Sequence, residues 1–175
     1  FIMTAGEDEI IAGAGIDTLV FTGDELVDDV TLTDTAIIVD GETSSLSGID
    51  AAELEGAAGN DTLDASGFTG DVVLSGGAGK DTLTGGSGDD TLIGGADDDT
   101  LVGGTGTDTV IVDGTAGEDK LTLTDDQSTG EGKDSLLDIE EAVVDAGAAD
   151  DSINASAFTG DAILIGGEGD DILTG

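Results

Sequence analysis

The sequence predicts an all-β protein, a parallel β-solenoid built from short repeated units. The first observation is a tandem array at residues 76–111, where four nine-residue units follow one another without a gap. The second is the division of each unit into six turn-forming residues and a tail that alternates polar, apolar and polar. The third is the absence of proline from the whole chain, which suits uninterrupted strand ladders. A fixed short period of this kind is typical of solenoids.

Each unit combines one turn with one strand. The four units read GGAGKDTLT, GGSGDDTLI, GGADDDTLV and GGTGTDTVI. Glycine tolerates positive φ and lets a backbone approach an ion closely, whereas the alternating tail buries one side chain in a strand. One buried aliphatic residue per unit makes a core only if coils stack, with about eighteen residues, or two units, in each coil. The aliphatic residues at the eighth position are Leu83, Leu92, Leu101 and Val110.

A two-unit coil brings together the aspartates at the sixth position of alternate units. We therefore expect Asp81 to face Asp99 along one edge, and Asp90 to face Asp108 along the other. Two carboxylates that close repel strongly in a poorly solvated turn, and a cation between them reverses the sign of that interaction. Oxygen-only ligands in a flexible turn suit Ca²⁺ better than Mg²⁺, and the chain has no His or Cys to favour zinc. The pattern predicts several bound calcium ions.

The four units resemble the repeat-in-toxin (RTX) haemolysin-type calcium-binding repeat, GGxGxDxUx, in which U is a large aliphatic residue. The resemblance implies a parallel β-roll that binds calcium in its turns through sixth-position aspartates and glycine carbonyls. One unit, residues 94–102, departs from the pattern because an aspartate replaces its fourth-position glycine, and we expect its turn to be altered. The ligands that the resemblance implies in the array are Asp81, Asp90, Asp99, Asp108, Gly77, Gly79, Gly86, Gly88, Gly95, Gly104 and Gly106.

Degenerate units outside the array add further candidate ligands. Two imperfect units occupy residues 1–20, and the pattern returns at residues 59–63, 117–119 and 149–153. A Phe-Thr-Gly-Asp turn ending at Asp71 looks like a half-coil turn with phenylalanine in place of the glycine pair, and we expect Asp71 to face Asp90. The further candidate metal ligands are Asp8, Asp17, Asp61, Asp71, Asp119, Asp151, Asp161 and Asp171.

The segments between the units are assigned from their patterns. Residues 30–34 and 35–41 read as strands around polar turns, and residues 127–135 read as a polar surface loop. Residues 48–55 and 138–145 have helical propensity, but their alternating aliphatic residues favour strands inside a solenoid.

A longer period relates the two halves of the chain. Residues 49–85 match residues 139–175 at a shift of 90, and residues 1–20 align with residues 92–111 at a shift of 91. We therefore interpret residues 1–175 as one elongated solenoid of two super-repeats, each roughly 90 residues long. In that phase a second molecule placed head to tail would nearly continue the solenoid. The sequence predicts either a window of a longer array or head-to-tail self-association.

Charge and residue types exclude several classes of function. The formal net charge is −38, and the only basic residues are Lys80, Lys120 and Lys133. Such a chain cannot neutralise nucleic-acid phosphates, and anionic membranes would repel it. It has no apolar run long enough to cross a bilayer, so we expect no direct membrane insertion. The lack of His excludes a Ser-His-Asp triad and a zinc-protease helix. Paired carboxylates leave a glycosidase open by residue type, but metal binding explains the pairs.

The favoured function is a calcium-stabilised structural module of a secreted bacterial surface or extracellular protein, such as a surface layer, an adhesin stalk or a matrix. The module is not expected to be an enzyme. The resemblance implies export by a one-step (type I) route and folding outside the cell, where calcium is plentiful. Two alternatives remain at this point: a self-assembling extracellular filament subunit, and the non-catalytic repeat domain of a secreted enzyme or toxin.

Overall fold

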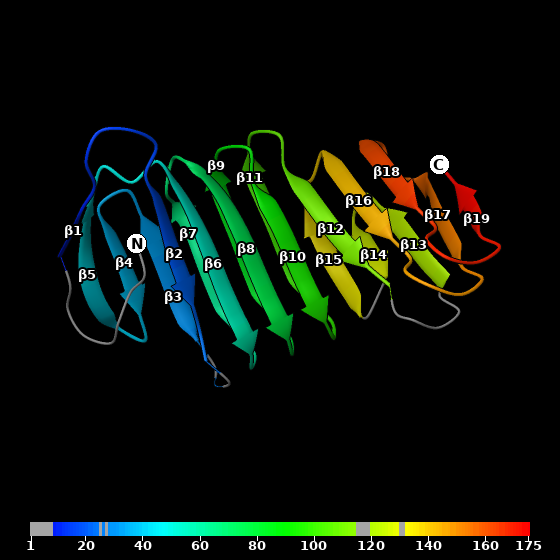
Figure 1. The fold of residues 1–175 in the computed structure, drawn as a ribbon, viewed down its shortest axis with the longest axis horizontal. Coiled ribbons are helices and arrows are strands. Elements are labelled where there is room, and N and C mark those ends of the chain that lie inside the picture. The colour runs from blue at the N-terminus through cyan, green and yellow to red at the C-terminus, as the bar shows by residue number, and fades with distance from the viewer. Residues whose placement is uncertain (1–8, 25, 27, 115–119, 130–131) are drawn as a thin grey trace.

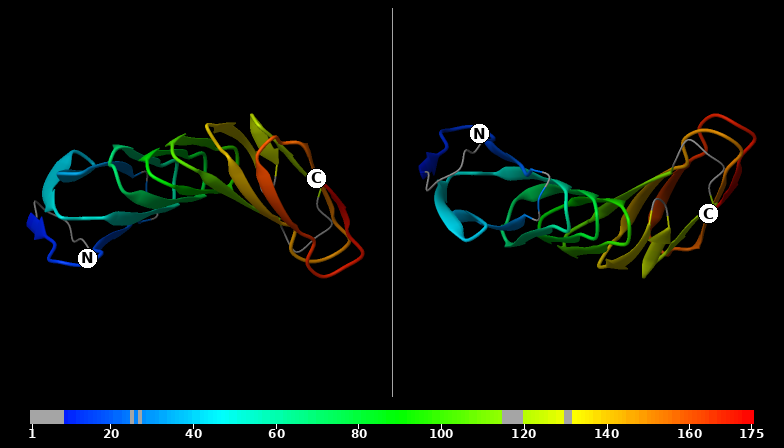
Figure 2. Two further views of the ribbon diagram at one scale, coloured as in Figure 1. Left: turned by 90° about the horizontal axis from the view of Figure 1, so that it is seen from above. Right: turned by 90° about the horizontal axis from the view of Figure 1, so that it is seen from below.

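Two parallel sheets face each other along an elongated solenoid in the computed structural model, which describes residues 9–24, 26, 28–114, 120–129 and 132–175. Successive strands of the coils alternate between the two sheets, so that the chain winds around a thin core (Figures 1 and 2). Within these described residues, no helix is long and apolar enough to span a membrane. The prediction of an all-β parallel solenoid is confirmed.

Among the described residues, the larger sheet has twelve strands and the smaller sheet has seven. In spatial order, the larger sheet contains β1 (Glu9–Ile11), β5 (Glu42–Ser47), β4 (Ala36–Val39), β3 (Asp29–Thr33), β7 (Thr62–Gly67), β9 (Thr82–Ser87), β11 (Thr100–Thr105), β15 (Lys133–Leu137), β14 (Gln127–Thr129), β13 (Lys120–Thr124), β17 (Ser152–Ala157) and β19 (Ile172–Thr174). The smaller sheet contains β18 (Asp161–Ile165), β16 (Glu141–Asp145), β12 (Thr109–Asp113), β10 (Thr91–Ala96), β8 (Asp71–Ala78), β6 (Ala51–Ala58) and β2 (Thr18–Thr22).

The nonapeptide array folds as two units per coil. Leu83 in β9 aligns with Leu101 in β11, and Leu92 in β10 aligns with Val110 in β12. All four side chains are at most 1% exposed, and they form part of one continuous core of aliphatic residues. Stacking in register therefore gives each single aliphatic residue the neighbours that it lacks within its own unit.

Each super-repeat also contains an antiparallel excursion of the larger sheet. Strands β3, β4 and β5 form a three-stranded meander in the first copy, and β13, β14 and β15 form its counterpart in the second. The prediction that residues 127–135 form a surface loop is wrong, because β14 and most of β15 lie there. Their sequence is polar, but Ser128 and Asp134 point inward and are buried. Residues 48–55 and 138–145 contribute to strands β6 and β16, as predicted.

The Phe-Thr-Gly-Asp turns are closed by a phenylalanine and by a contact from a neighbouring hairpin. Phe68 is 2% exposed in the core, and the Phe68 N–H donates to the carbonyl of Ala65. The tip of the β3–β4 hairpin holds the turn from outside, because Asp34 Oδ1 accepts the N–H of Thr69 at 2.8 Å and its hydroxyl at 3.1 Å. Asp125 of the β13–β14 hairpin accepts the same two donors from Thr159 in the second copy.

Truncating the buried phenylalanine tests whether its ring closes the first Phe-Thr-Gly-Asp turn. We expect Phe68→Ala to cost about 3–5 kcal/mol of unfolding free energy in saturating calcium, because it leaves a cavity in a fully packed site. Urea unfolding followed by circular dichroism measures the cost as a lower midpoint at unchanged slope. Phe158→Ala is the matched control, since Phe158 is only half-buried and should cost less. Equal costs for the two variants would contradict this role of burial.

Candidate metal centre

The glycine-rich turns adopt the left-handed conformations that their sequence predicts. Within the array, positive φ angles occur at the second positions and at the fourth positions other than Gly88, as at Gly77 (φ 105°) and Gly79 (φ 122°). The altered unit carries Asp97 at its fourth position, and this residue takes φ 76°. Aspartate tolerates the left-handed region better than most residues, so the turn keeps its form without glycine. The other predicted glycines with positive φ are Gly86, Gly95, Gly104 and Gly106.

Gly88 is restricted by its neighbours. A Cβ added there would lie 2.9 Å from both the Gly70 carbonyl oxygen and Asp71 Oδ1, closer than side chains tolerate. The fourth-position glycine of this turn is therefore needed because the adjacent coil passes so close.

One edge of the solenoid carries a continuous ladder of aspartates, which we call the first ladder. Each backbone N–H donates to the carboxylate of the aspartate on the next coil, so one carboxylate oxygen per residue is used inside the ladder. The N–H of Asp61 donates to Asp81 Oδ1 at 2.8 Å, and that of Asp81 donates to Asp99 Oδ1 at 2.8 Å. The predicted pairing of Asp81 with Asp99 is confirmed. The members of the first ladder are Asp28, Asp61, Asp81, Asp99 and Asp134.

The opposite edge carries a shorter ladder of the same kind, which we call the second ladder. The N–H of Asp90 donates to Asp108 Oδ1 at 2.9 Å, which confirms the predicted pair. The ladder ends on Glu140, because the Asp108 N–H donates to Glu140 Oε2 at 3.0 Å. At its other end, the N–H of Val72 donates to Asp90 Oδ1. A further pair at the C-terminal end joins the Asp151 N–H to Asp171 Oδ1.

The ladder aspartates are buried with one oxygen unused. Asp61, Asp81, Asp90, Asp99 and Asp108 are all at most 3% exposed. In the part of the chain that the structure describes, the Oδ2 atom of each of them has no hydrogen-bond partner, and the same holds for Asp17. A buried polar atom without a partner is costly, and an ionised one more so. These oxygens therefore point to a missing cationic or hydrogen-bonding group.

Except at Asp17, whose unit begins with Ala12, the unused oxygens share one setting, in which a first-position glycine leaves space. A Cβ added at Gly56 would lie 2.5 Å from Asp61 Oδ2 and 2.8 Å from the carbonyl oxygen of Gly76. The same trio recurs around Gly85, with Asp90 Oδ2 and the Gly103 carbonyl. Any side chain at these glycines would fill the space between a carboxylate and a carbonyl of the next coil. Both groups are the hard oxygen ligands that Ca²⁺ prefers.

Side chains alone do not complete a metal site. Over the described residues, no group of three or more carboxylates converges in an arrangement that could hold an ion. A bound ion would therefore need backbone carbonyls and water as well as the ladder carboxylates. Calcium accepts such mixed oxygen shells of six to eight ligands (about 2.3–2.6 Å away), whereas zinc would call for His or Cys. The residues present fit calcium.

Burial makes several of the ladder carboxylates hard to ionise when no metal is bound. Burial, reinforced by neighbouring carboxylates, raises the pKa of Asp90 to about 6 and that of Asp99 to about 7. Burial likewise raises the pKa values of Asp81, Asp108 and Asp134 above the ordinary aspartate value. Adjacent negative charges add to the cost of ionisation, and a nearby cation would remove that cost.

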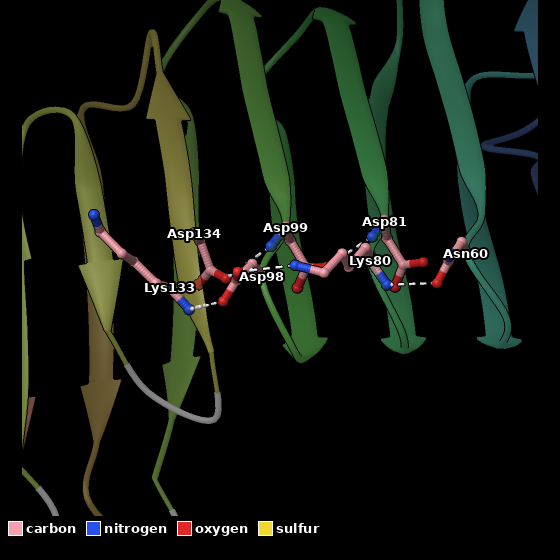
Figure 3. Close-up of polar contacts among 7 residues, drawn as sticks. All are labelled: Asn60, Lys80, Asp81, Asp98, Asp99, Lys133 and Asp134. Atoms are coloured by element: carbon pink, nitrogen blue, oxygen red, sulfur yellow. Dashed lines mark hydrogen bonds and ion pairs between the residues drawn. The ribbon is translucent and has the colours of Figure 1, made fainter.

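The fifth-position residues of the first edge form an exposed row beside the first ladder (Figure 3). Asn60 Oδ1 accepts the N–H of Lys80, and Asp98 Oδ1 accepts the N–H of Lys133. The Lys80 ammonium binds Asp98 Oδ2 at 2.8 Å, and this hydrogen bond lowers the pKa of the Asp98 carboxyl. Both side chains of this ion pair are about 60% exposed, so solvent screens it strongly. Two of the three lysines of the chain thus lie along one edge.

Asp71 is one residue out of the predicted register. The prediction that Asp71 faces Asp90 is wrong, because the β8–β10 register places Val72 opposite Asp90. Asp71 instead accepts the N–H of Asp89 through Oδ1 at 2.9 Å. The reason is an insertion of two residues: Leu63 and Leu74 are eleven residues apart, whereas Leu74 and Leu83 are nine apart.

The remaining predicted ligands divide into three groups. Asp161 is exposed and aligns with Glu141 in the β16–β18 register. Asp17, Asp151 and Asp171 lie in ladder contacts like those of the array. Asp8 and Asp119 lie outside the described residues.

Four ladder carboxylates escaped the sequence analysis: Asp28, Asp50, Asp134 and Glu140. The signal for Asp134 was present, because TGEGKDSLL (129–137) keeps glycine at positions two and four, Asp at six and Leu at eight. Asp28 is the sixth residue of GDELVDDVT (23–31), which begins with glycine and has valine at the eighth place. Asp50 and Glu140 lie in shortened turns that keep no such spacing.

Stacked carboxylates in the glycine-rich turns of a parallel solenoid define a β-roll. The chain belongs to the RTX calcium-binding nonapeptide repeat family, whose pattern matches four segments at residues 4–20, 49–68, 69–110 and 156–175. A comparison with curated proteins finds no match. Repeats of this family bind Ca²⁺, are structural rather than catalytic, and are typical of secreted extracellular bacterial proteins.

The raised pKa values predict that acid stabilises the metal-free fold. Between the ordinary aspartate pKa of 3.8 and the values of about 6 and about 7 at Asp90 and Asp99, the folded state holds protons that the unfolded chain has released. Unfolding free energy should therefore fall as pH rises through this window and recover as pH falls. Circular dichroism in chelator, from about pH 8 to about pH 5, measures the gain of β-structure.

The control for this pH effect is the double variant Asp90→Asn with Asp99→Asn. Neutral amides cannot release these protons, so the slope of stability against pH should become shallower. A metal-free protein that loses β-structure steadily from pH 7 to pH 5 would contradict the expectation.

Proposed function

We propose that this chain is a calcium-stabilised structural module of an extracellular or cell-surface protein. The observation that carries the proposal is the set of buried ladder aspartates with one unused carboxylate oxygen each: Asp61, Asp81, Asp90, Asp99 and Asp108. Leaving several such carboxylates ionised in a folded protein is costly, because each lacks both water and a counter-charge. Calcium between the coils would turn this repulsion into attraction.

The ligands would come from the turns of adjacent coils. The Oδ2 atoms of Asp61, Asp81, Asp90 and Asp99 are candidates, together with carbonyl oxygens of the glycine-rich turns such as Gly76 and Gly103. Bound calcium would supply positive charge to the ladder and lock the turns. The protein supplies the glycines that leave space and the strands that hold the two edges in register.

Calcium binding and folding would then be one process. A chain with net charge −38 repels itself, and its binding sites exist only when two coils have stacked. Binding free energy therefore becomes folding free energy. This coupling suits a protein that is exported unfolded by a type I route and folds where calcium is plentiful. A surface layer, an adhesin stalk or an extracellular matrix would use such a module for its rigidity.

We also interpret residues 1–175 as one elongated unit of two super-repeats. The recurrence of the three-stranded meander supports this interpretation, as does the hairpin aspartate that holds each Phe-Thr-Gly-Asp turn.

Calcium titration tests the proposed function directly. We expect chelator to remove most β-sheet circular dichroism and added calcium to restore it cooperatively, because the sites form only in stacked coils. Light scattering measured on the same samples reports expansion or assembly. Full β-structure at about micromolar free calcium or below would contradict metal-dependent folding.

A pair of variants localises the effect to the ladder. Asp90→Ala removes a buried carboxylate in the middle of the second ladder, and we expect it to lower the cooperativity of the calcium transition and raise its midpoint. Gln127→Ala is the control, because Gln127 is exposed at the start of β14. Equal transitions for the two variants would count against stacked calcium sites.

Head-to-tail association is a second candidate, favoured by the apolar residues of the C-terminal coil. Leu173 in β19 is 45% exposed, whereas Ile163 and Ile172, which are 61% and 66% exposed, align with the outward-facing Val143 and Ser152. Leu173 aligns with Ile153, so it continues the row of core residues. We infer that another coil covers this edge, supplied by adjoining sequence or by a second copy of the chain. Fibres in the electron microscope that dissolve in chelator would support the second copy.

A third candidate is the non-catalytic repeat domain of a secreted enzyme or toxin. The family supports it, since its repeats are themselves non-catalytic. A catalytic domain encoded in the same gene would decide for it.

A further inference from the structure

A three-residue turn from β15 to β16 brings a second carboxylate against the end of the second ladder. The turn consists of Asp138, Ile139 and Glu140, and the buried residues on either side of it, Leu136 and Ala142, are six residues apart, whereas their partners Leu101 and Val110 in the array are nine apart. The carbonyl of Asp108 accepts two N–H groups from this region, those of Glu140 at 3.1 Å and Glu141 at 2.9 Å. The Asp108 N–H in turn donates to Glu140 Oε2 at 3.0 Å. Reciprocal hydrogen bonds thus hold Glu140 beside Asp108.

One carboxylate oxygen of Asp108 accepts no hydrogen bond from the described residues at this position. Asp108 is 0% exposed, and its Oδ2 has no hydrogen-bond partner among the described residues. This oxygen faces the Cα of Gly103, since a Cβ added there would lie 2.6 Å from it. The carbonyl oxygen of Asp138 crowds the same position. A carboxylate oxygen and a carbonyl oxygen of adjacent coils therefore meet beside a glycine.

The same arrangement occurs one coil earlier with a glycine carbonyl. There Gly85 is flanked by Asp90 Oδ2 and the carbonyl of Gly103. In the short turn the carbonyl of Asp138 takes the place of that glycine carbonyl, and Glu140 takes the place of the sixth-position aspartate. The nonapeptide pattern stops at residue 110 and resumes at residue 156, so neither residue belongs to it.

The first super-repeat provides an independent copy of this carboxylate pair. The Asp17 N–H donates to Asp50 Oδ2 at 2.9 Å, and the Asp17 carbonyl accepts the N–H groups of Asp50 and Ala51. Asp17 Oδ2 is again buried and without a hydrogen-bond partner in the described region. Gly48 and Asp138 correspond at a shift of 90, and both have positive φ, at 74° and 53°. The first copy thus preserves the backbone and the pair of charges, although Ala12 stands where Gly103 leaves space in the second copy.

We propose that Asp108, Glu140 and the carbonyl of Asp138 form a further calcium site, beyond the nonapeptide pattern, with Asp17 and Asp50 as its counterpart in the first super-repeat. The proposal rests on the proposed function, that is, on calcium binding by the ladders. Glutamate serves as well as aspartate here because Ca²⁺ accepts either carboxylate, and water completes its flexible shell. The meander therefore does not interrupt the row of ions on this edge.

The test compares two adjacent glutamates in the full chain. Glu140→Gln removes a negative charge, but its amide oxygen can still accept the N–H of Asp108, so the turn itself is preserved. Glu141→Gln is the matched control, because Glu141 is exposed like Glu140 but accepts a long hydrogen bond of 3.4 Å from Thr109 Oγ1 instead of a ladder N–H. Isothermal titration with calcium counts the bound ions, and terbium luminescence measures site occupancy separately.

We expect Glu140→Gln to bind one ion fewer than the unmodified protein, or to bind its weakest ion roughly tenfold less tightly, because affinity follows the number of ligand charges. Glu141→Gln should match the unmodified protein. Asp50→Asn should cause the same loss in the first super-repeat, which keeps the test decisive if Glu140→Gln fails to fold in saturating calcium.

Unchanged ion number and affinities in both Glu140→Gln and Asp50→Asn, with the unmodified protein binding calcium normally, would overturn this inference alone. Failure of the unmodified protein to bind calcium at all would instead overturn the proposed function on which it rests.

Discussion

The structure depends on one recurring interaction, the hydrogen bond from a backbone N–H to the aspartate carboxylate of the next coil. This bond fixes the distance between coils at each turn, and it uses one of the two carboxylate oxygens. The other oxygen is left inside, beside a glycine and a carbonyl. The contact that aligns the coils therefore also creates a buried charge that the protein cannot neutralise by itself. An unsatisfied buried group costs about 1–3 kcal/mol, and a domain has only about 5–15 kcal/mol of net stability, so a handful of such oxygens decides whether it folds.

The chain uses two different solutions for closing a turn. In the array the turn is polar inside, with an aspartate whose second oxygen calls for a cation. In the Phe-Thr-Gly-Asp turns an apolar residue, Val72, occupies the ladder position, and Phe68 fills the core nearby. Asp34 then reaches the turn from the neighbouring hairpin and satisfies Thr69 from the outside. These turns contain no buried ladder carboxylate of their own, so their packing does not depend on an ion in the same way.

How much the sequence revealed depended on where its period was regular. The spacing of nine predicted the Asp81–Asp99 and Asp90–Asp108 contacts. Two units make one coil, so residues eighteen apart in the array lie next to each other on adjacent coils. Asp71 was misplaced because it lies ten residues from both Asp61 and Asp81, whereas the ladder position lies nine residues before Asp81, at Val72. The two extra residues between Leu63 and Leu74 come before this position. The buried aliphatic residues are the better reference, since the core fixes the register.

Glu140 shows what a period cannot reveal, whereas Asp134 keeps the nonapeptide spacing within residues 129–137. Asp134 reaches the first ladder from β15, which runs parallel to β11 and antiparallel to β14, where Ser128 donates to Asp134 Oδ2 at 2.6 Å. Glu140 reaches the second ladder from a turn only three residues long. Both carboxylates lie where the preceding coil presents a backbone N–H that needs an acceptor. A carboxylate is required wherever the preceding coil presents its backbone N–H, whatever fold of the chain brings it there. The regular repeat is therefore one way to meet this requirement, and the meanders meet it by another.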